Sequence, residues 1–144
     1  MKLKRTLFAI LFIMLIAAGA AQAATWLDGY AWNVISQTNA ERAKQGIAQL
    51  RVDAELMSAA RIRAEEISRK FSHTRPNGQT GSSVTAAARN ENIARGHGTP
   101  DRVMAAWLTS DSHRRNLLAR GYGSIGVACV EVNGIAYWVQ LFGL

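Results

Sequence analysis

The chain has 144 residues, of which 49% are hydrophobic, and its 17 basic and 10 acidic residues give a formal net charge of +7. This length predicts a single domain, and no segment after residue 23 is long and apolar enough to span a membrane. Cys129 is the single cysteine, so an intramolecular disulfide is excluded.

The N-terminus has the pattern of a secretory signal peptide over residues 1–23. Three basic residues, at positions 2, 4 and 5, precede an apolar run over 7–18 and a small-x-small sequence that ends at Ala23. We therefore expect cleavage after Ala23, which leaves a secreted or periplasmic domain over 24–144. The alternative is an uncleaved anchor, but the apolar run is shorter than the roughly 20 residues that a spanning helix needs.

The charge of the domain argues against a nucleic-acid partner. Without the leader, 14 basic and 10 acidic residues remain, a net charge of +4. Such a moderate positive charge is compatible with anionic envelope surfaces. Cys129 lies in the apolar run 125–130 and is predicted to be a small buried hydrophobe, because no histidine lies close in sequence to activate it.

Two helices are predicted in the first half of the domain. Apolar residues recur with helical spacing from Leu27 to Ile35 and predict a helix over about 28–44, which Gly46 ends. Asp53 is a suitable N-cap for a second helix over about 54–70. One apolar stripe is predicted to be buried, and the charges off it to face solvent. The stripe comprises Leu56, Ala60, Ala64, Ile67 and Phe71, and the charges are Arg61, Arg63, Glu65, Arg69 and Lys70.

The middle of the chain is predicted to be mostly loop and short helix. Residues 72–88 contain a proline and two glycines and predict a loop, with a short helix or strand near 83–88. Residues 90–93 have the composition of a turn or a helix end. Thr99, followed by Pro100, starts a helix that runs to Trp107. After a turn at 110–112, a second short helix is expected to begin near residue 112 or 113 and to end by residue 121.

The C-terminal residues predict a β-hairpin. Asn133-Gly134 is the strongest short hairpin signal, and as the turn it places Val132 opposite Ile135 and Cys129 opposite Trp138. The flanking strands, 125–132 and 135–142, are apolar on both faces and must be covered on both sides. The expected class is α+β, with helices on both faces of a small, largely antiparallel sheet.

Three residues suggest a functional site: His73, Glu91 and His113. Two imidazoles and a carboxylate are suitable ligands for zinc or another divalent cation. The histidines lie 40 positions apart, so only the fold can bring them together. Three interpretations stay open: a metal site, a structural clasp of hydrogen bonds, and metal- or base-assisted hydrolysis. His113 at a helix N-terminus is expected to have a lowered pKa, which favours its neutral form.

Other polar groups near these segments have simpler interpretations. His97 is expected to face solvent. Ser110 and Ser112 lie near His113, but no nucleophile elbow or orienting acid accompanies them, which argues against a serine hydrolase. Three arginines around the last short helix could contact an anionic ligand, face solvent or cap a helix: Arg114, Arg115 and Arg120.

Five stretches together resemble the CAP superfamily of cysteine-rich secretory proteins, antigen 5 and pathogenesis-related proteins. In chain order they are Asn39-Ala-Glu-Arg42, Phe71-Ser-His73-Thr-Arg-Pro76, Glu91-Asn-Ile93, the stretch Trp107 to Leu118, and Gly123-Ser-Ile-Gly-Val with the closing Tyr137-Trp-Val-Gln-Leu-Phe-Gly143. The resemblance covers nearly all of 24–144 and is greatest to short, disulfide-free bacterial members.

The resemblance implies a three-layer α-β-α sandwich, an extracytoplasmic location and a polar cleft. Carried over position by position, His73 and His113 are the cleft histidines and Glu91 is the first acid; in some members this cleft binds zinc or another divalent cation. Ser110 stands where many animal members have a second acid, which argues against a mechanism that needs two acids.

We therefore expect a monomeric binding module at the cell envelope or outside the cell, with a cleft formed by His73, Glu91, Ser110 and His113. Its ligand would be a small molecule, a lipid or an envelope polymer, since some relatives bind sterols or fatty acids. One alternative is a metal-assisted hydrolase of peptide or envelope polymer. Another is a purely structural or protein-interaction module. Whether the protein is an enzyme stays open, with binding favoured.

Overall fold

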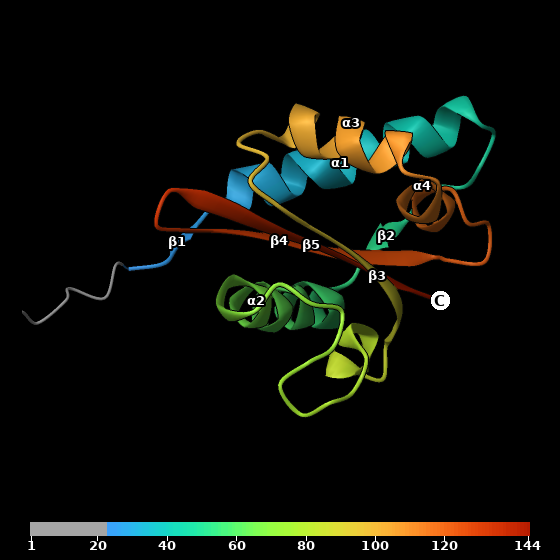
Figure 1. Cartoon of the computed structure of the whole chain (residues 1–144). Coiled ribbons are helices and arrows are strands. Elements are labelled where there is room, and N and C mark those ends of the chain that lie inside the picture. The colour runs from blue at the N-terminus through green and yellow to red at the C-terminus, as the bar shows by residue number, and fades with distance from the viewer. Residues whose placement is uncertain (1–22) are drawn as a thin grey trace, which may run out of the picture.

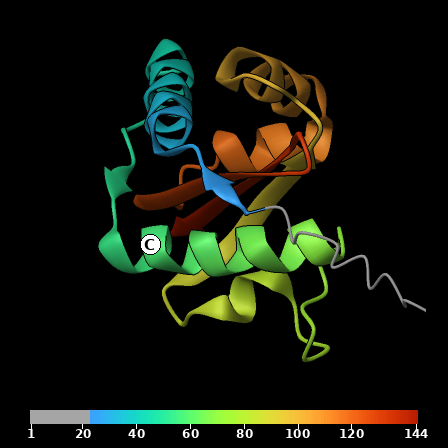
Figure 2. The ribbon, with the colours of Figure 1, turned by 90° about the vertical axis from the view of Figure 1, so that its left-hand side faces the viewer.

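The computed structural model describes residues 23–144 and has three layers (Figure 1). Three helices, α1, α3 and α4, lie on one face of the sheet, and α2 with a short 3-10 helix lies on the other, as the side view also shows (Figure 2). The predicted leader over 1–23 lies outside the described residues except for its last position. The predicted α+β sandwich is confirmed.

The chain order of the elements is β1-α1-β2-α2-η1-β3-α3-α4-β4-β5. The helices are α1 (Asp28–Lys44), α2 (Ala54–Arg69), the 3-10 helix η1 (Gly81–Val84), α3 (Pro100–Thr109) and α4 (Asp111–Leu117). The strands are β1 (Thr25–Trp26), β2 (Arg51–Val52), β3 (Ala88–Arg95), β4 (Ser124–Val132) and β5 (Ile135–Gly143). Within residues 23–144 no helix combines the length and the apolar character needed to cross a bilayer.

The sheet has the order β1-β4-β5-β3, with β2 pairing to β4 in parallel and all other pairs antiparallel. In the predicted hairpin, Val132 pairs with Ile135 and Cys129 with Trp138, as expected. Asn133 and Gly134 both have positive φ, 52° and 73°, the backbone that a two-residue type I′ turn requires. β3 forms one edge of the sheet, because it pairs only with β5.

Each face of the sheet carries its own hydrophobic cluster. Trp107 packs on the face covered by α1 and α3, and Leu56 and Ile67 of α2 pack on the other. The approach of α2 to the sheet is unusually close at Gly126 of β4. A Cβ atom at this position would lie 2.1 Å from the carbonyl carbon of Leu56 and 2.4 Å from the amide nitrogen of Met57. The two elements can therefore meet only because this residue has no side chain.

The structure corrects four local predictions. Residues 90–93 are not a turn or helix end, because they lie inside β3. The short helix of the long loop is η1, slightly earlier than 83–88. Phe71, predicted as part of the buried stripe, is 42% exposed. Arg63, predicted to face solvent, is fully buried. Its spacing from Ala60 and Ile67 explains this burial, since residues three and four apart share a helix face.

Candidate functional site

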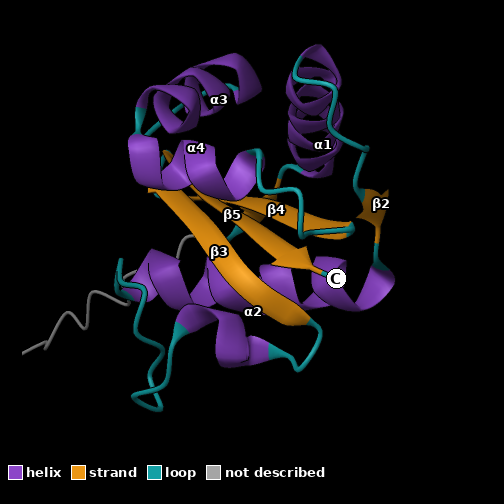
Figure 3. Ribbon diagram, turned by 90° about the vertical axis from the view of Figure 1, so that its right-hand side faces the viewer, coloured by secondary structure: helices purple, strands orange, loops and turns teal. Residues whose placement is uncertain are grey.

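The loop after α2, strand β3 and helix α4 lie at the same edge of the sheet (Figure 3). Their residues line an open cavity of about 420 Å³. His73 comes from the loop, Glu91 from β3 and His113 from α4, so the fold brings together the three residues singled out from the sequence. The other lining residues are Thr74, Thr80, Gly81, Ser82, Asn90, Ser112 and Asn116. Ser110 does not line this cavity, although its hydroxyl contacts His113.

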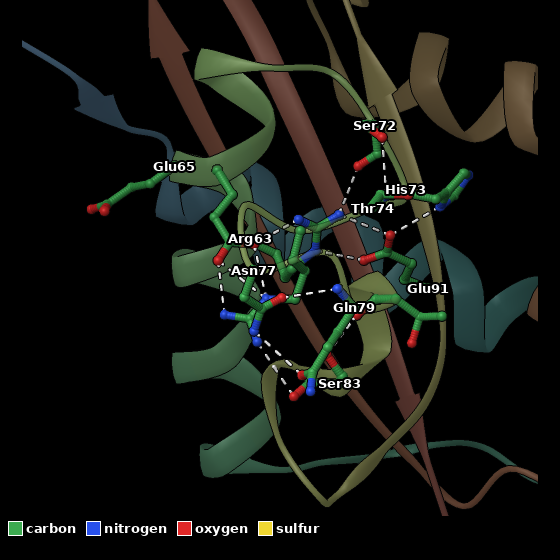
Figure 4. A network of polar contacts seen from close by, with 12 residues as sticks. Arg63, Glu65, Ser72, His73, Thr74, Asn77, Gln79, Ser83 and Glu91 are labelled. Atoms are coloured by element: carbon green, nitrogen blue, oxygen red, sulfur yellow. Dashed lines mark hydrogen bonds and ion pairs between the residues drawn. The ribbon is translucent and has the colours of Figure 1, made fainter.

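His73 is held by Glu91 (Figure 4). Its Nδ1 atom lies 2.9 Å from Oε1 of Glu91, and the histidine side chain is 62% exposed whereas the carboxylate is only 4% exposed. An ionised carboxylate only accepts hydrogen bonds, so Nδ1 must carry the proton. In the neutral form of His73, the lone pair is therefore on Nε2, the ring nitrogen that Glu91 does not contact.

Glu91 is in turn bound by Arg63, whose guanidinium Nε and Nη2 donate to the two carboxylate oxygens at 2.9 Å each. Burial alone would raise the pKa of Glu91, but the hydrogen bonds from His73 and Arg63 outweigh it and hold this pKa below its ordinary value. Glu91 is therefore an ionised, fully engaged carboxylate. Sequence reasoning missed Arg63, although its position on the apolar face of α2 was a signal.

The same arginine ties the histidine loop to α2. Arg63 also donates to Glu66 at 2.7 Å and to the carbonyl oxygen of Ser72 at 2.9 Å. Glu66 accepts a further hydrogen bond from Arg75 at 2.8 Å. Two arginines and two carboxylates thus form one network, and the residue before His73 is fixed by its backbone.

Gly81 completes this arrangement from the other side of the loop. A Cβ atom here would lie 1.9 Å from Oε1 of Glu91, so η1 rests directly on the carboxylate. Because the Glu91 side chain is held by two partners, it cannot move away cheaply. A residue with a side chain therefore does not fit at position 81.

His113 is placed by β3 and by the turn before α4. Its Nδ1 atom lies 2.8 Å from the Ser110 hydroxyl, and the amide of Asn92 donates to its carbonyl oxygen at 3.1 Å. Asn116 of α4 donates to the carbonyl oxygen of Glu91 at 3.4 Å, and Trp107 of α3 donates to that of Ile93 at the same distance. Both carbonyls belong to β3, so the site's helices are joined to the strand by side chains.

Burial and the positive charge of His73 lower the pKa of His113. The sequence predicted this direction, but from a different cause, the helix dipole. We expect proton NMR of the two-histidine site to place the midpoint of His113 below 6.5. Replacing His73 with alanine should raise the pKa of His113, because the positive charge that helps to lower it is removed. An unchanged midpoint in His73→Ala would show that the two rings do not sense each other.

The remaining predicted groups lie outside the cavity. His97 is half-buried, and its carbonyl oxygen accepts from Trp138 at 2.8 Å. Arg120 donates to the carbonyl oxygens of Gly46 and Gln45, so it caps the end of α1. Cys129 is buried as predicted, and burial raises the pKa of its thiol to about 12.

The donor set for a metal is smaller than the sequence suggested. Within residues 23–144, no group of three or more His, Cys, Asp or Glu side chains is placed to hold a metal ion. Both oxygens of Glu91 accept from Arg63, so this carboxylate does not fit the part of a direct ligand. The groups that fit are the two imidazoles, one oriented by Glu91 and the other by Ser110.

Comparison with protein-family models matches residues 35–142 to the CAP model, described as the cysteine-rich secretory protein family. This match covers three quarters of the sequence. The chain belongs to this family. The resemblance inferred from the five sequence stretches is thereby confirmed.

The CAP domain is also similar to individual proteins. It is 35% identical over 124 residues to the uncharacterised protein YkwD of Bacillus subtilis, a match that covers 81% of this chain and 48% of that protein. The chain thus spans about half the length of this curated relative.

Solved structures share the fold at low sequence identity. An outer surface protein of Borrelia burgdorferi has a TM-score of 0.74 at 23% identity, and the match covers 85% of this chain and 97% of that one. An extracellular protein with an SCP domain from Bacillus anthracis has a TM-score of 0.69 at 24% identity, over 81% of this chain and 40% of that one. These matches support the three-layer architecture.

Proposed function

We propose that this CAP domain is an extracytoplasmic binding module, and that His73 and His113 are the groups through which its cleft holds a ligand. The observation that carries the proposal is the pairing of each imidazole with a fixed partner. Glu91 and Ser110 each contact an Nδ1 atom, and both rings line one cavity. Among residues 23–144 the Nε2 atoms of both rings form no hydrogen bond, and two oriented rings of this kind are suited to bind a ligand because little conformational freedom is lost on binding.

Location outside the cytoplasm is supported from two directions. The first 23 residues have the pattern of a signal peptide, and the similar proteins from Borrelia burgdorferi and Bacillus anthracis are described as an outer surface protein and an extracellular protein. Both structural matches are below 25% identity, so they support the location only together with the leader.

The state of Glu91 favours binding over hydrolysis. A general base needs a pKa near the working pH and a free oxygen atom. Glu91 has a lowered pKa, and both of its oxygens are bound by Arg63 and His73. Ser110 at the other candidate position is no acid. The carboxylate is therefore suited to orient His73 and not to exchange protons with a substrate.

We further propose that the same two imidazoles take a divalent cation such as zinc. Neutral imidazole nitrogen is a normal zinc ligand, and a carboxylate behind the ring raises its basicity. A bound zinc ion would supply a Lewis acid with positions left for water or ligand. Glu91 would then act through His73, as an orienting partner.

Zinc titration by calorimetry on residues 24–144 tests the proposal. This range contains both hydrophobic clusters. We expect one site with a Kd on the order of micromolar, about −8 kcal/mol. His73→Ala and His113→Ala should each abolish the heat, while His97→Ala should retain it. Binding that survives either of the first two variants would overturn the two-histidine site, as would the absence of any saturable binding.

A further inference from the structure

A second cavity, of about 310 Å³, adjoins the histidine site on the other side of His113. From it we infer that the cleft binds an extended peptide, with one apolar side chain in the second cavity and an acidic group beside Arg95. This inference rests on the proposed binding function and names its ligand class. The second cavity is lined by Phe71, Ile93, Ala94, Arg95, His97, Ala106, Trp107, Ser110 and His113.

The two cavities lie along one strand. Asn90 and Glu91 line the first, Ile93 and Ala94 line the second, and His113 lines both. β3 rises about 3.3 Å per residue, so the two halves of the cleft are roughly 10 Å apart. About three residues of an extended chain span this distance. A ligand that passes His113 along β3 therefore reaches both cavities at once.

The two halves differ in chemistry. The first is lined by polar side chains, and among them the hydroxyl groups of Thr80 and Ser82 suit the amide groups of a polypeptide. The second has an apolar wall formed by Trp107 and Ile93, with Phe71 at 42% exposure beside them. An exposed aromatic side chain at a cavity is typical of a binding contact.

Arg95 gives the second cavity a charge. Its guanidinium lies 5.9 Å from the centroid of the Phe71 ring, and among residues 23–144 no ion pair joins it to a carboxylate. The aromatic contact leaves the N–H donors at the guanidinium edge for an acceptor, and a carboxylate is the acceptor that they match best. An acidic group next to the apolar residue complements this charge.

A peptide fits these features better than a lipid does. A long acyl chain needs apolar side chains along its whole length, but beyond His113 the lining residues of the cleft are His, Thr, Ser, Asn, Glu and one Gly. Backbone pairing with β3 does not supply the recognition, because the carbonyls of Glu91 and Ile93 already accept from Asn116 and Trp107. Recognition therefore depends on the side chains of the domain. These side chains can distinguish a ligand only if it carries side chains of its own.

The test is a titration of the ¹⁵N-labelled domain, in EDTA, with the blocked peptides acetyl-Ser-Ser-Leu-Asp-amide and acetyl-Asp-Leu-Ser-Ser-amide, followed by NMR. The two orders cover both chain directions. We expect saturable shifts at Phe71, Arg95 and His113 for at least one order. Replacing its Asp with Asn should weaken binding about three- to tenfold.

Two variants assign the contacts. Arg95→Gln should bind the Asp and Asn peptides equally, and Phe71→Ala should weaken both by about tenfold. Arg102→Gln removes an exposed arginine of α3 that does not line the cavity, and should behave as the wild type. Intact folding of each variant is checked from its own NMR spectrum.

Several results would overturn the inference. They are no saturable shift with either peptide, equal binding of Asp and Asn peptides by the wild type, or shifts at these residues with decanoate or chitotetraose but not with peptide. Because EDTA is present, the outcome does not depend on zinc. If the domain bound zinc but not the peptides, the peptide inference would be refuted and the proposal of a two-histidine metal site would be retained.

Discussion

Replacing Arg63 with alanine is expected to lower the free energy of unfolding by about 3–5 kcal/mol. The substitution leaves the carboxylate of Glu91, 4% exposed, without its arginine partner and with His73 as its remaining hydrogen-bond donor, and it also removes the donors to Glu66 and to the Ser72 carbonyl. Breaking a buried pair on one side is costly because the remaining charge has lost both its partner and water. Urea unfolding followed by circular dichroism gives the value directly.

Arg69→Ala is the matched control, because Arg69 ends the same helix and is exposed. It should cost less than about 1 kcal/mol. The double variant Arg63→Ala with Glu91→Gln should recover part of the lost free energy of unfolding, since the buried charge is then absent. Similar losses for the two arginine variants would contradict the central place of Arg63 in the fold.

Gly126→Ala should destabilise the domain by about 3 kcal/mol, at the upper end of the range for overpacked cores. The new methyl group would lie 2.1 Å from the backbone of Leu56, which cannot rotate away as a side chain can. α2 must therefore shift off β4, and the buried contacts of Leu56 and Ile67 are loosened. Thermal and urea unfolding measure the effect.

Gly29→Ala makes the same chemical change where space is free. Gly29 lies in the first turn of α1, and nothing is within 4 Å of its Cβ position. Alanine is favoured over glycine in helices by up to about 1 kcal/mol, so this variant should be as stable as the parent or more so. If Gly126→Ala were as stable to unfolding as Gly29→Ala, the close approach of α2 to the sheet would be refuted.

Elements with strong local signals could be predicted from the sequence. Asp53 accepts from the amide of Leu56 at 3.0 Å and Thr99 from that of Arg102 at 3.3 Å, so both N-caps were found where expected. The Asn133-Gly134 turn fixed the register of β4 and β5. In each case the signal and its partner lie within a few residues, which is why sequence alone was sufficient.

What depends on distant partners could not be predicted. β3 is a strand because it pairs with β5 more than 40 residues later, and its own composition resembles a turn. The charge of Arg63 predicted exposure to solvent, but its burial is stabilised by Glu91, 28 positions away, together with Glu66 and the Ser72 carbonyl. The joining of His73, Glu91 and His113 was expected from the family resemblance. That Glu91 is bound to Arg63, and so orients His73, required the structure.

The side chains that close over β3 have a consequence for how the protein behaves at high concentration. A sheet edge with free carbonyls is a template for another chain and a route to aggregation. On β3 the carbonyls of Glu91 and Ile93 are already taken by Asn116 and Trp107. The groups that position His113 therefore also protect the edge from association with other copies. A domain that keeps an open cleft at the border of its sheet can in this way resist edge-to-edge association at high concentration.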